Sequence, residues 1–202
     1  AYSQAVGAQC WGMTMGTIQN NPATIIRNQG GGPPETSMHG YWLCNPGSTV
    51  SRLDFTNDTQ ACSPKGDLIK TEHYMGATGN ANHGYCAGGR SPDTSTTNRM
   101  SYANDTATGV AKGGLTIARR DLAGVGNVNY GYFCGGYSSY TAVDRLDYAS
   151  DSTDMVRKGD LPFGWYESSG TGTQDYGYLF AGRSYYQELL RIDYANDTNA
   201  AL

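Results

Sequence analysis

The chain has 202 residues, including 28 glycines and 16 tyrosines, and charged residues make up 16% of it. This length can bury a sizeable core, and the composition favours one turn-rich β domain over residues 1–202 rather than a helical protein. The formal net charge of −4 and the lack of a basic face argue against a nucleic-acid partner, and no apolar run approaches the roughly 18 residues that cross a bilayer, so no membrane partner is expected.

One line of eight residues recurs four times in the chain, beginning at Arg52, Arg99, Arg145 and Arg191. The arginine numbers differ by 47, 46 and 46. A fixed step of this size marks a repeat architecture, in which each unit is a small sheet that cannot bury its own face. The units are placed at residues 20–66, 67–113, 114–159 and 160–202, after an N-terminal arm of residues 1–19.

The middle of each unit predicts two paired strands, which are clearest in the third unit. Residues 130–136 read Tyr-Gly-Tyr-Phe-Cys-Gly-Gly and predict a buried strand, strand b, whose glycines would let it crowd near a central axis. Residues 142–148 alternate apolar and polar side chains, which is the period of a strand with one buried face, strand c. Residues 149–152 supply turn-forming side chains, so a hairpin turn follows strand c.

Two further strands complete the predicted unit. Residues 153–157 return as an outer strand d, and residues 158–162 then turn out of the sheet. Residues 169–173 would be strand a of the next unit. Four short strands in each repeat are what a propeller blade requires.

The two ends of the chain predict how the ring closes. The last unit ends at Leu202 directly after strand c, so it is expected to lack strand d. Residues 20–30 read like residues 104–113, which gives residues 23–29 the register of an orphan strand d. Because an unpaired edge is costly, this strand is expected to close a four-bladed ring by completing the last blade. The alternative is strand exchange with a neighbouring copy, which would make an oligomer or a fibre.

The predicted unit resembles the kelch repeat, which also has an apolar strand ending in Gly-Gly, an Asp/Tyr strand and a Leu-Pro turn, here Leu161-Pro162. The chain departs from kelch in lacking a tryptophan in the fourth strand, near which Cys62, Val110 and Val156 stand. The resemblance implies an all-β fold, a kelch-type β-propeller of four blades with four antiparallel strands each, in which the N-terminal strand closes the last blade.

The particular residues of the repeat indicate a resemblance to a narrower group of proteins. Arg-Leu/Ile-Asp-Tyr-Ala-Asn-Asp-Thr, followed by Lys-Gly-Leu and Gly-Tyr-Phe-Gly-Gly, is similar to repeats in virion structural and tail-associated proteins of marine tailed bacteriophages over residues 40–198. This resemblance implies a viral protein of the virion, assembled in the host cytoplasm, whose partners are other virion or assembly proteins. An extracellular surface is the alternative location.

The residues that carry chemistry elsewhere form no reactive pattern here. His39, His73 and His83 lie at unrelated repeat positions without metal-ligand spacing, so no metal and no other cofactor is expected. No hydrolase elbow, phosphate loop or zinc-protease motif is present. The recurrent Arg-x-Asp, as at Arg145 and Asp147, is expected to be a structural pair that meets the adjacent strand.

The cysteines and the Asn-Asp-Thr triplets are also interpreted structurally. Three cysteines in apolar stretches are expected to be buried thiols, with a disulfide between the first two as the alternative: Cys44, Cys86 and Cys134. The triplets fit the glycosylation pattern in three copies, at Asn57, Asn104 and Asn196. The fourth copy lacks the pattern, so turn formation is favoured over glycosylation and over calcium binding.

The loop between strands b and c differs from unit to unit, and all four loops are expected on one face of the ring. Tyr, Ser and Arg side chains give amphipathic contact at low ordering cost, which suits protein or sugar surfaces. The predicted binding-face residues are Arg90, Tyr137, Tyr140, Arg183, Tyr185 and Tyr186. The alternative is that these tyrosines only shield the strand ends.

These patterns predict a non-enzymatic structural or attachment component that displays binding loops on a rigid propeller. Its expected partners are other virion proteins, copies of itself by strand exchange, and a surface glycan. The alternative function is a carbohydrate-binding lectin or host-recognition adhesin. An enzyme would need one blade loop with paired carboxylates or histidine ligands that the other blades lack, and the sequence offers none.

Overall fold

The computed structural model describes residues 39–43, 48–54, 57, 59–90, 92–138, 140–180 and 188–201. Within these residues the fold is all-β, and the strands form four antiparallel sheets, each built from strands that are consecutive in the chain. No helix among the described residues is both long and apolar enough to span a membrane.

The first sheet contains β1 (His39–Leu43), β2 (Thr49–Asp54) and β3 (Ser63–Asp67). The second contains β4 (Gly76–Gly79), β5 (His83–Ala87), β6 (Thr97–Ser101) and β7 (Val110–Lys112). The third contains β8 (Ala123–Gly126), β9 (Tyr130–Cys134), β10 (Ala142–Asp147) and β11 (Val156–Asp160). The last contains β12 (Ser169–Gly172), β13 (Tyr176–Phe180), β14 (Leu189–Asp193) and β15 (Thr198–Ala201).

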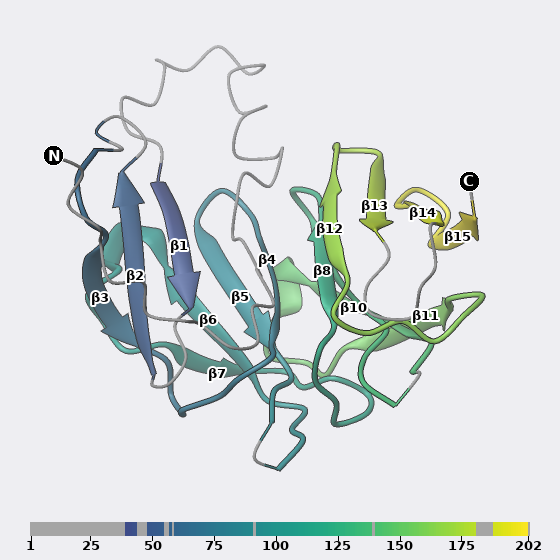
Figure 1. Ribbon diagram of the computed structural model, residues 1–202, viewed down its shortest axis with the longest axis horizontal. Helices are drawn as coiled ribbons and strands as arrows, with labels where there is room; N and C mark the ends of the chain where they lie inside the picture. Colours follow the sequence, from purple (N-terminus) through teal and green to yellow (C-terminus); the bar gives the residue numbers. More distant parts are fainter. Residues whose placement is uncertain are drawn as a thin grey trace, which may run out of the picture.

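The second, third and last sheets spread around a shared line formed by their first strands, β4, β8 and β12, in a propeller-like arrangement (Figure 1). β8 lies between β4 and β12, so strand a is innermost. The prediction that strand b is innermost is therefore wrong. Gly124 shows how close the inner strands come, because a Cβ on it would lie 2.0 Å from the carbonyl oxygen of Ala77 on β4. Any larger residue would push the two sheets apart.

The double glycine after strand b is required by its backbone conformation, not by close approach to the central axis. Gly135 and Gly136 have φ angles of +70° and +141°, which L side chains rarely adopt. This conformation lets the Gly136 N–H donate to the carbonyl oxygen of Trp165, 2.6 Å away, in the segment that leads into the next sheet. The glycines thus tie the end of one sheet to the beginning of its neighbour.

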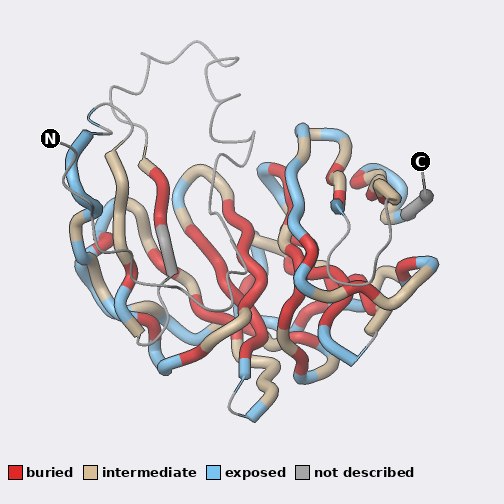
Figure 2. The backbone as a smooth tube through the Cα atoms, in the orientation of Figure 1, coloured by how far each residue is buried: buried red, intermediate tan, exposed pale blue. Residues whose placement is uncertain are grey.

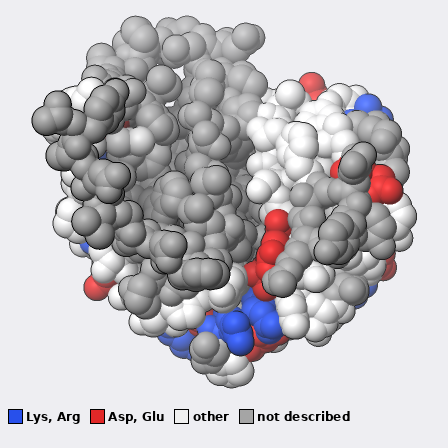
Figure 3. Space-filling view, in the orientation of Figure 1, with Lys and Arg blue, Asp and Glu red and all other residues white. Residues whose placement is uncertain are grey.

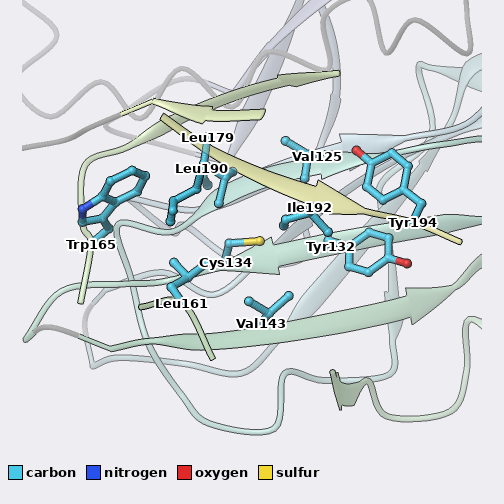
Figure 4. Packing of buried hydrophobic residues seen from close by; sticks show 11 residues of the cluster. Val125, Tyr132, Cys134, Val143, Leu161, Trp165, Leu179, Leu190, Ile192 and Tyr194 are labelled. Atoms are coloured by element: carbon cyan, nitrogen blue, oxygen red, sulfur yellow. The ribbon is translucent and has the colours of Figure 1, made fainter. Parts of the chain in front are cut away.

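The hydrophobic core is divided among the spaces between consecutive sheets, and buried residues follow these spaces in Figure 2. Between the third and last sheets, Tyr132 and Cys134 of β9 face Leu190 and Ile192 of β14, and Trp165 closes one end of the cluster (Figure 4). Within the described residues, each cluster therefore lies between two consecutive sheets, as in a repeat protein.

The outer strands differ from the prediction in two ways. β11 comprises Val156–Asp160 rather than residues 153–157, so the Lys-Gly segment belongs to the strand. The last sheet does not lack strand d, because β15 pairs with β14. A turn of four residues reverses the chain between them, which replaces the longer connection of the other units. The proposed closing strand, residues 23–29, lies outside the described residues.

The eight-residue motif that recurs in the sequence joins each sheet to the one before it. Asp197, in the turn after β14, accepts a hydrogen bond from Tyr132 Oη of β9 at 2.7 Å and from Arg145 Nη1 of β10 at 2.6 Å. Lys158 Nζ of β11 lies 3.0 Å from the same carboxylate. The ring of Tyr194 stacks on Tyr132, with 4.9 Å between centroids. One turn therefore engages three strands of the neighbouring sheet.

The same inter-sheet cluster, meaning the Tyr, Arg and Lys of one sheet with the Asp of the next, is found at the other described junctions. Asp151 of the third sheet is held by Tyr85, Arg99 and Lys112 of the second. Asp105 of the second sheet is held by Tyr41, Arg52 and Lys65 of the first.

The recurrent Arg-x-Asp was expected to meet the adjacent strand as one structural pair, but its two members have separate partners. Arg145 bonds to Asp197 in another sheet, whereas Asp147 accepts the N–H of Ala149, 2.9 Å away, and so caps the turn that follows its own strand. Tight turns at Tyr102–Asn104 and Tyr148–Ser150 confirm the turn interpretation of these copies. The aspartate of each turn also binds side chains of the neighbouring sheet, which local turn chemistry does not predict.

Two of the predicted buried thiols are confirmed. Cys86 and Cys134 are buried and free, and burial raises the pKa of each thiol to about 12. Because Cys86 is free, the alternative disulfide with Cys44 is wrong; Cys44 itself lies outside the described residues.

Candidate functional site

The candidate site lies where strand b ends and strand a begins, at the lower edge of the molecule in Figure 1. Here the loop after strand b meets the segment that precedes an innermost strand. Arg90 pairs with His73 through an isolated β-bridge, and the Gly89 N–H donates to the carbonyl of Arg119 at 3.0 Å. We call this surface the loop face; basic and acidic side chains gather side by side on it in Figure 3.

A stacked arginine and tyrosine form the centre of the loop face. The guanidinium carbon of Arg120 lies 3.7 Å from the centroid of the Tyr137 ring. Arg120 Nη1 also donates to Asp93 Oδ1 at 2.6 Å, and its Nε lies 3.4 Å from Asp121 Oδ2. The edge of Tyr166 meets Tyr137 at 5.5 Å between centroids. Tyr137 nevertheless stays 40% exposed, so part of this aromatic ring faces solvent while Arg120 is held by the ring and by two carboxylates.

Three residues in equivalent positions, two before each described innermost strand, have left-handed backbones. Tyr74, Asp121 and Glu167 have φ angles of 62°, 59° and 55°. The Asp121 N–H donates to the carbonyl of Tyr74 at 2.7 Å, and the Glu167 N–H donates to the carbonyl of Asp121 at 3.0 Å. A line of backbone hydrogen bonds thus links the sheets around their shared axis. Non-glycine residues in this conformation are uncommon and carry strain.

Asp121 is the electrostatically unusual member of this line. Its side chain is buried and its Oδ1 atom has no hydrogen-bond partner within the described part of the chain. Burial, helped by the charge of Glu167, raises the pKa of Asp121 to about 6, although Arg120 opposes the shift. The carboxyl group therefore changes its charge close to neutral pH, and its ionised form is destabilised.

A fully buried ion pair supports the loop face from beneath. Arg119 Nη1 donates to Asp144 Oδ2 at 2.8 Å, and neither side chain is exposed to solvent. Arg119 also donates to the carbonyls of Gly135 and Phe133, while Thr116 donates to Asp144 through both its N–H and its hydroxyl. Such complete pairing is what makes buried charges tolerable.

The structure places three of the six predicted binding residues on the loop face. The Arg90 guanidinium carbon lies 5.9 Å from the centroid of Tyr74, Tyr137 lies beneath Arg120, and Tyr140 is partly buried where its N–H donates to Gly136. The other three lie outside the described residues: Arg183, Tyr185 and Tyr186.

Sequence reasoning missed the residues that organise this surface, above all Arg120, Asp93 and Asp121. The adjacent pair Arg119-Arg120 was a visible signal, since it is the basic pair of the chain. The spacing of Tyr74, Asp121 and Glu167, which follows the repeat, was also visible. Nothing in their side-chain types indicates a left-handed backbone, so their importance emerges only from the structure.

The loop face combines paired charges with a partly exposed aromatic ring. Arg120 is already neutralised by Asp93, and the described residues contain no group of three or more His, Cys, Asp or Glu side chains that could hold a metal ion. Burial and nearby cations lower the pKa values of His39 and His83, so both rings are neutral at pH 7.

No protein-family model and no curated protein matches the chain. Its function is therefore inferred from the residues of the fold and of the loop face.

Proposed function

We propose that the chain is a non-enzymatic scaffold of kelch type that serves as a structural or attachment component of a virion. The observation that carries this proposal is the use made of the recurrent polar residues. The Tyr, Arg, Lys and Asp of the repeat are engaged in inter-sheet clusters such as that around Asp197. Groups engaged in this way hold the sheets together. The virion assignment itself follows from the resemblance of the repeat wording to tail-associated phage proteins.

The scaffold would act by rigid display. Loops whose ends are tied to neighbouring sheets, as Gly136 is tied to Trp165, lose little conformational freedom when they bind. The exposed Tyr137 ring, backed by Arg120, supplies a contact surface of the amphipathic kind that protein interfaces favour.

The test of the virion role is the protein content of particles. Virus particles purified on a density gradient from the source of the gene should contain peptides of this chain in fixed ratio to other particle proteins. Peptides that occur only in the soluble fraction would end the proposal. The measurement does not depend on which ligand the loops bind.

A second candidate, a glycan-binding adhesin, is favoured by the partly exposed Tyr137 ring, since sugar faces stack on aromatic rings. A glycan array would detect binding by the purified chain. If the ring makes the contact, Tyr137→Ala should abolish binding and Tyr137→Phe should keep it. Arg157→Ala, at an exposed position on the outer strand β11, is the control and should bind like the unmodified chain.

A further inference from the structure

The last sheet lies at one end of the longest axis of the molecule (Figure 1) and has one side turned away from the third sheet. Leu179 of β13 and Leu190 of β14 are buried in the cluster shared with the third sheet. Because side chains alternate along a strand, their neighbours Tyr178 and Arg191 lie on the opposite side. These two residues, which we call the outward pair, are paired in register across β13 and β14.

The equivalent pairs of the other sheets each hold a carboxylate. Tyr132 and Arg145 have the same register one repeat earlier. They donate to Oδ1 and Oδ2 of Asp197 in the following sheet, at 2.7 and 2.6 Å. The corresponding Tyr and Arg of the first and second sheets likewise bind an aspartate of the sheet that follows each of them. A tyrosine hydroxyl and a guanidinium group in this register therefore form a binding site for a carboxylate.

The outward pair has the orientation of an occupied pair without the carboxylate. The guanidinium carbon of Arg191 lies 4.7 Å from the centroid of Tyr176, as that of Arg145 lies 4.3 Å from its own tyrosine ring on β9. No carboxylate of the described residues forms an ion pair with Arg191. Asp193, on the same strand, caps its own turn by accepting from Ala195 and Asn196. A cation held in advance in this way loses little side-chain freedom when a ligand arrives.

Apolar residues beside the outward pair are more exposed than their equivalents. Phe180 on β13 is 46% exposed, whereas Cys134, one repeat earlier, is fully buried. Leu189 pairs in register with Phe180 and is partly buried, whereas its equivalent Val143 is buried. An open apolar surface next to a charged group is typical of a surface that binds a protein rather than of a site for a small ion.

The occupied junctions show what kind of partner fits this surface. Each aspartate that is bound there stands three residues after a tyrosine, in one tight turn. At the last junction the ring of Tyr194 stacks on Tyr132, while Asp197 takes the hydrogen bonds. The described aspartates of this position, Asp105, Asp151 and Asp197, are all engaged at their own junctions. None of them is therefore available to the outward pair.

We propose that the outward side of the last sheet binds a partner protein through a tight turn that carries an aspartate three residues after an aromatic residue. Tyr178 and Arg191 hold the carboxylate, the aromatic ring of the partner stacks on Tyr178, and apolar residues next to the turn cover Phe180. The lysine that completes the described clusters, such as Lys158, has no counterpart in β15, so this contact is weaker than an inter-sheet junction. The proposal does not depend on the virion role or on what the loop face binds.

A peptide with the sequence of such a turn tests the site. The probe is a cyclic peptide that contains Asp-Tyr-Ala-Asn-Asp-Thr, the sequence of residues 193–198. Titrated into the isotope-labelled full chain, it should shift the NMR signals of the Arg191 side chain and of the Tyr178 ring. Arg191→Ala should weaken peptide binding by at least about 10-fold, because a hydrogen bond between charged groups is lost. Arg157→Ala, an exposed position on the outer strand of the third sheet, is the matched control and should bind like the unmodified chain.

Two further probes separate the carboxylate from the turn that carries it. The same peptide with asparagine in place of its second aspartate should bind at least about 10-fold more weakly, because it cannot accept a charge-assisted hydrogen bond from Arg191. Sodium acetate at the same concentration supplies a carboxylate without a turn or an aromatic ring, and it should leave both signals almost unchanged. Tyr178→Phe keeps the ring and should lose only the part of the affinity that its hydroxyl supplies.

Four results would overturn the proposal. The first is a chain whose Arg191 and Tyr178 signals do not move at millimolar peptide. The second is an equal response to acetate, which would assign the site to small carboxylates. The third is an Arg191→Ala variant that keeps the thermal unfolding midpoint and binds the peptide as tightly as the unmodified chain. The fourth is self-association of the chain that Arg191→Ala abolishes, which would assign the surface to a second copy.

Discussion

Arg145 and Asp197 belong to different sheets, and a 2.6 Å contact between Nη1 and Oδ2 joins them. Their separation of 52 residues is just over one repeat, so the ion pair connects one unit to the next. Because Tyr132 and Lys158 reach the same carboxylate, the pair belongs to a network rather than standing alone. Networks of partly buried charges contribute more to stability than isolated surface pairs do.

Loss of Arg145 should destabilise the fold. Arg145→Ala removes a charge-assisted hydrogen bond at a partly buried site and should lower the free energy of unfolding by about 2 kcal/mol. Urea denaturation followed by tyrosine and tryptophan fluorescence would measure it. The matched control is Arg157→Ala, which breaks the more exposed pair with Asp160 and should cost no more than about 0.5 kcal/mol. Equal losses in the two variants would contradict a special role for the cluster.

The inter-sheet aspartates should set the acid limit of stability. Burial alone would raise the pKa of Asp197, but hydrogen bonds from Tyr132 and Lys158 and the charge of Arg145 lower it below the ordinary value of 3.8. Asp151 is lowered in the same way by Lys112 and its partners, against the effect of burial. These carboxylates bind protons more weakly in the folded state, so their contribution is complete above about pH 4 and is lost as the pH falls through their folded pKa values.

The measurement is a series of thermal unfolding curves from about pH 2 to pH 7, in the range where carboxyl groups titrate. Asp197→Asn should show lower stability at pH 7 and a shallower decline toward acid than the unmodified chain. Asparagine suits the left-handed backbone at this position, where φ is 54°. An unchanged acid decline would show that Asp197 does not contribute to it.

Asp121 should make stability depend on pH in the opposite direction to Asp151 and Asp197. Its pKa is raised to about 6, so its contribution is fully favourable below the unfolded value near 3.8 and is lost as the pH rises through about 6. Asp121→Asn removes the buried charge and keeps a residue that tolerates a φ of 59°. At pH 8 the variant should be more stable by on the order of 2 kcal/mol, and at pH 4 the two proteins should be nearly equal. A variant that is less stable at pH 8 would show that the charge is compensated.

Arg119 and Asp144 form a buried ion pair. The equivalent positions one repeat later hold buried apolar residues instead, Trp165 and Leu190. Asp144→Leu alone leaves a buried arginine unpaired and should cost about 3–5 kcal/mol. The double variant Arg119→Met with Asp144→Leu should recover most of this loss, since apolar residues of similar volume remove the unpaired charge. Chemical denaturation of both variants and of Arg119→Met alone completes the cycle. Additive losses would mean that the two side chains are not coupled.

Much of the fold was predictable from the chain because a strand leaves a local pattern. The alternation in residues 142–148 predicted strand c, and β10 comprises Ala142–Asp147. The apolar segment of residues 130–136 predicted strand b, and β9 comprises Tyr130–Cys134. The outer strand was misplaced because Lys158-Gly159 has the composition of a turn, although its backbone pairs with β10 across a register shift.

The candidate site was less predictable because its main contacts join segments far apart in the chain. Tyr137 was predicted from its loop, but its partner Arg120 stands before another strand, and the stacking of the two depends on how β8 and β9 present their ends. Arg145 and Asp147 were predicted to meet the adjacent strand as one structural pair, whereas Arg145 binds Asp197 in the turn of another sheet.

The amino-acid sequence by itself determined the repeat, the sheet in each unit and the turn after strand c, because strand periodicity and turn chemistry act over a few residues. Only the tertiary structure decided that strand a is innermost, that Asp197 belongs to the neighbouring sheet and that Asp121 has a left-handed backbone. The physical reason is that sheet packing brings together side chains about one repeat apart, and burial then determines which charges are paired and which carboxyl group has its pKa raised to about 6.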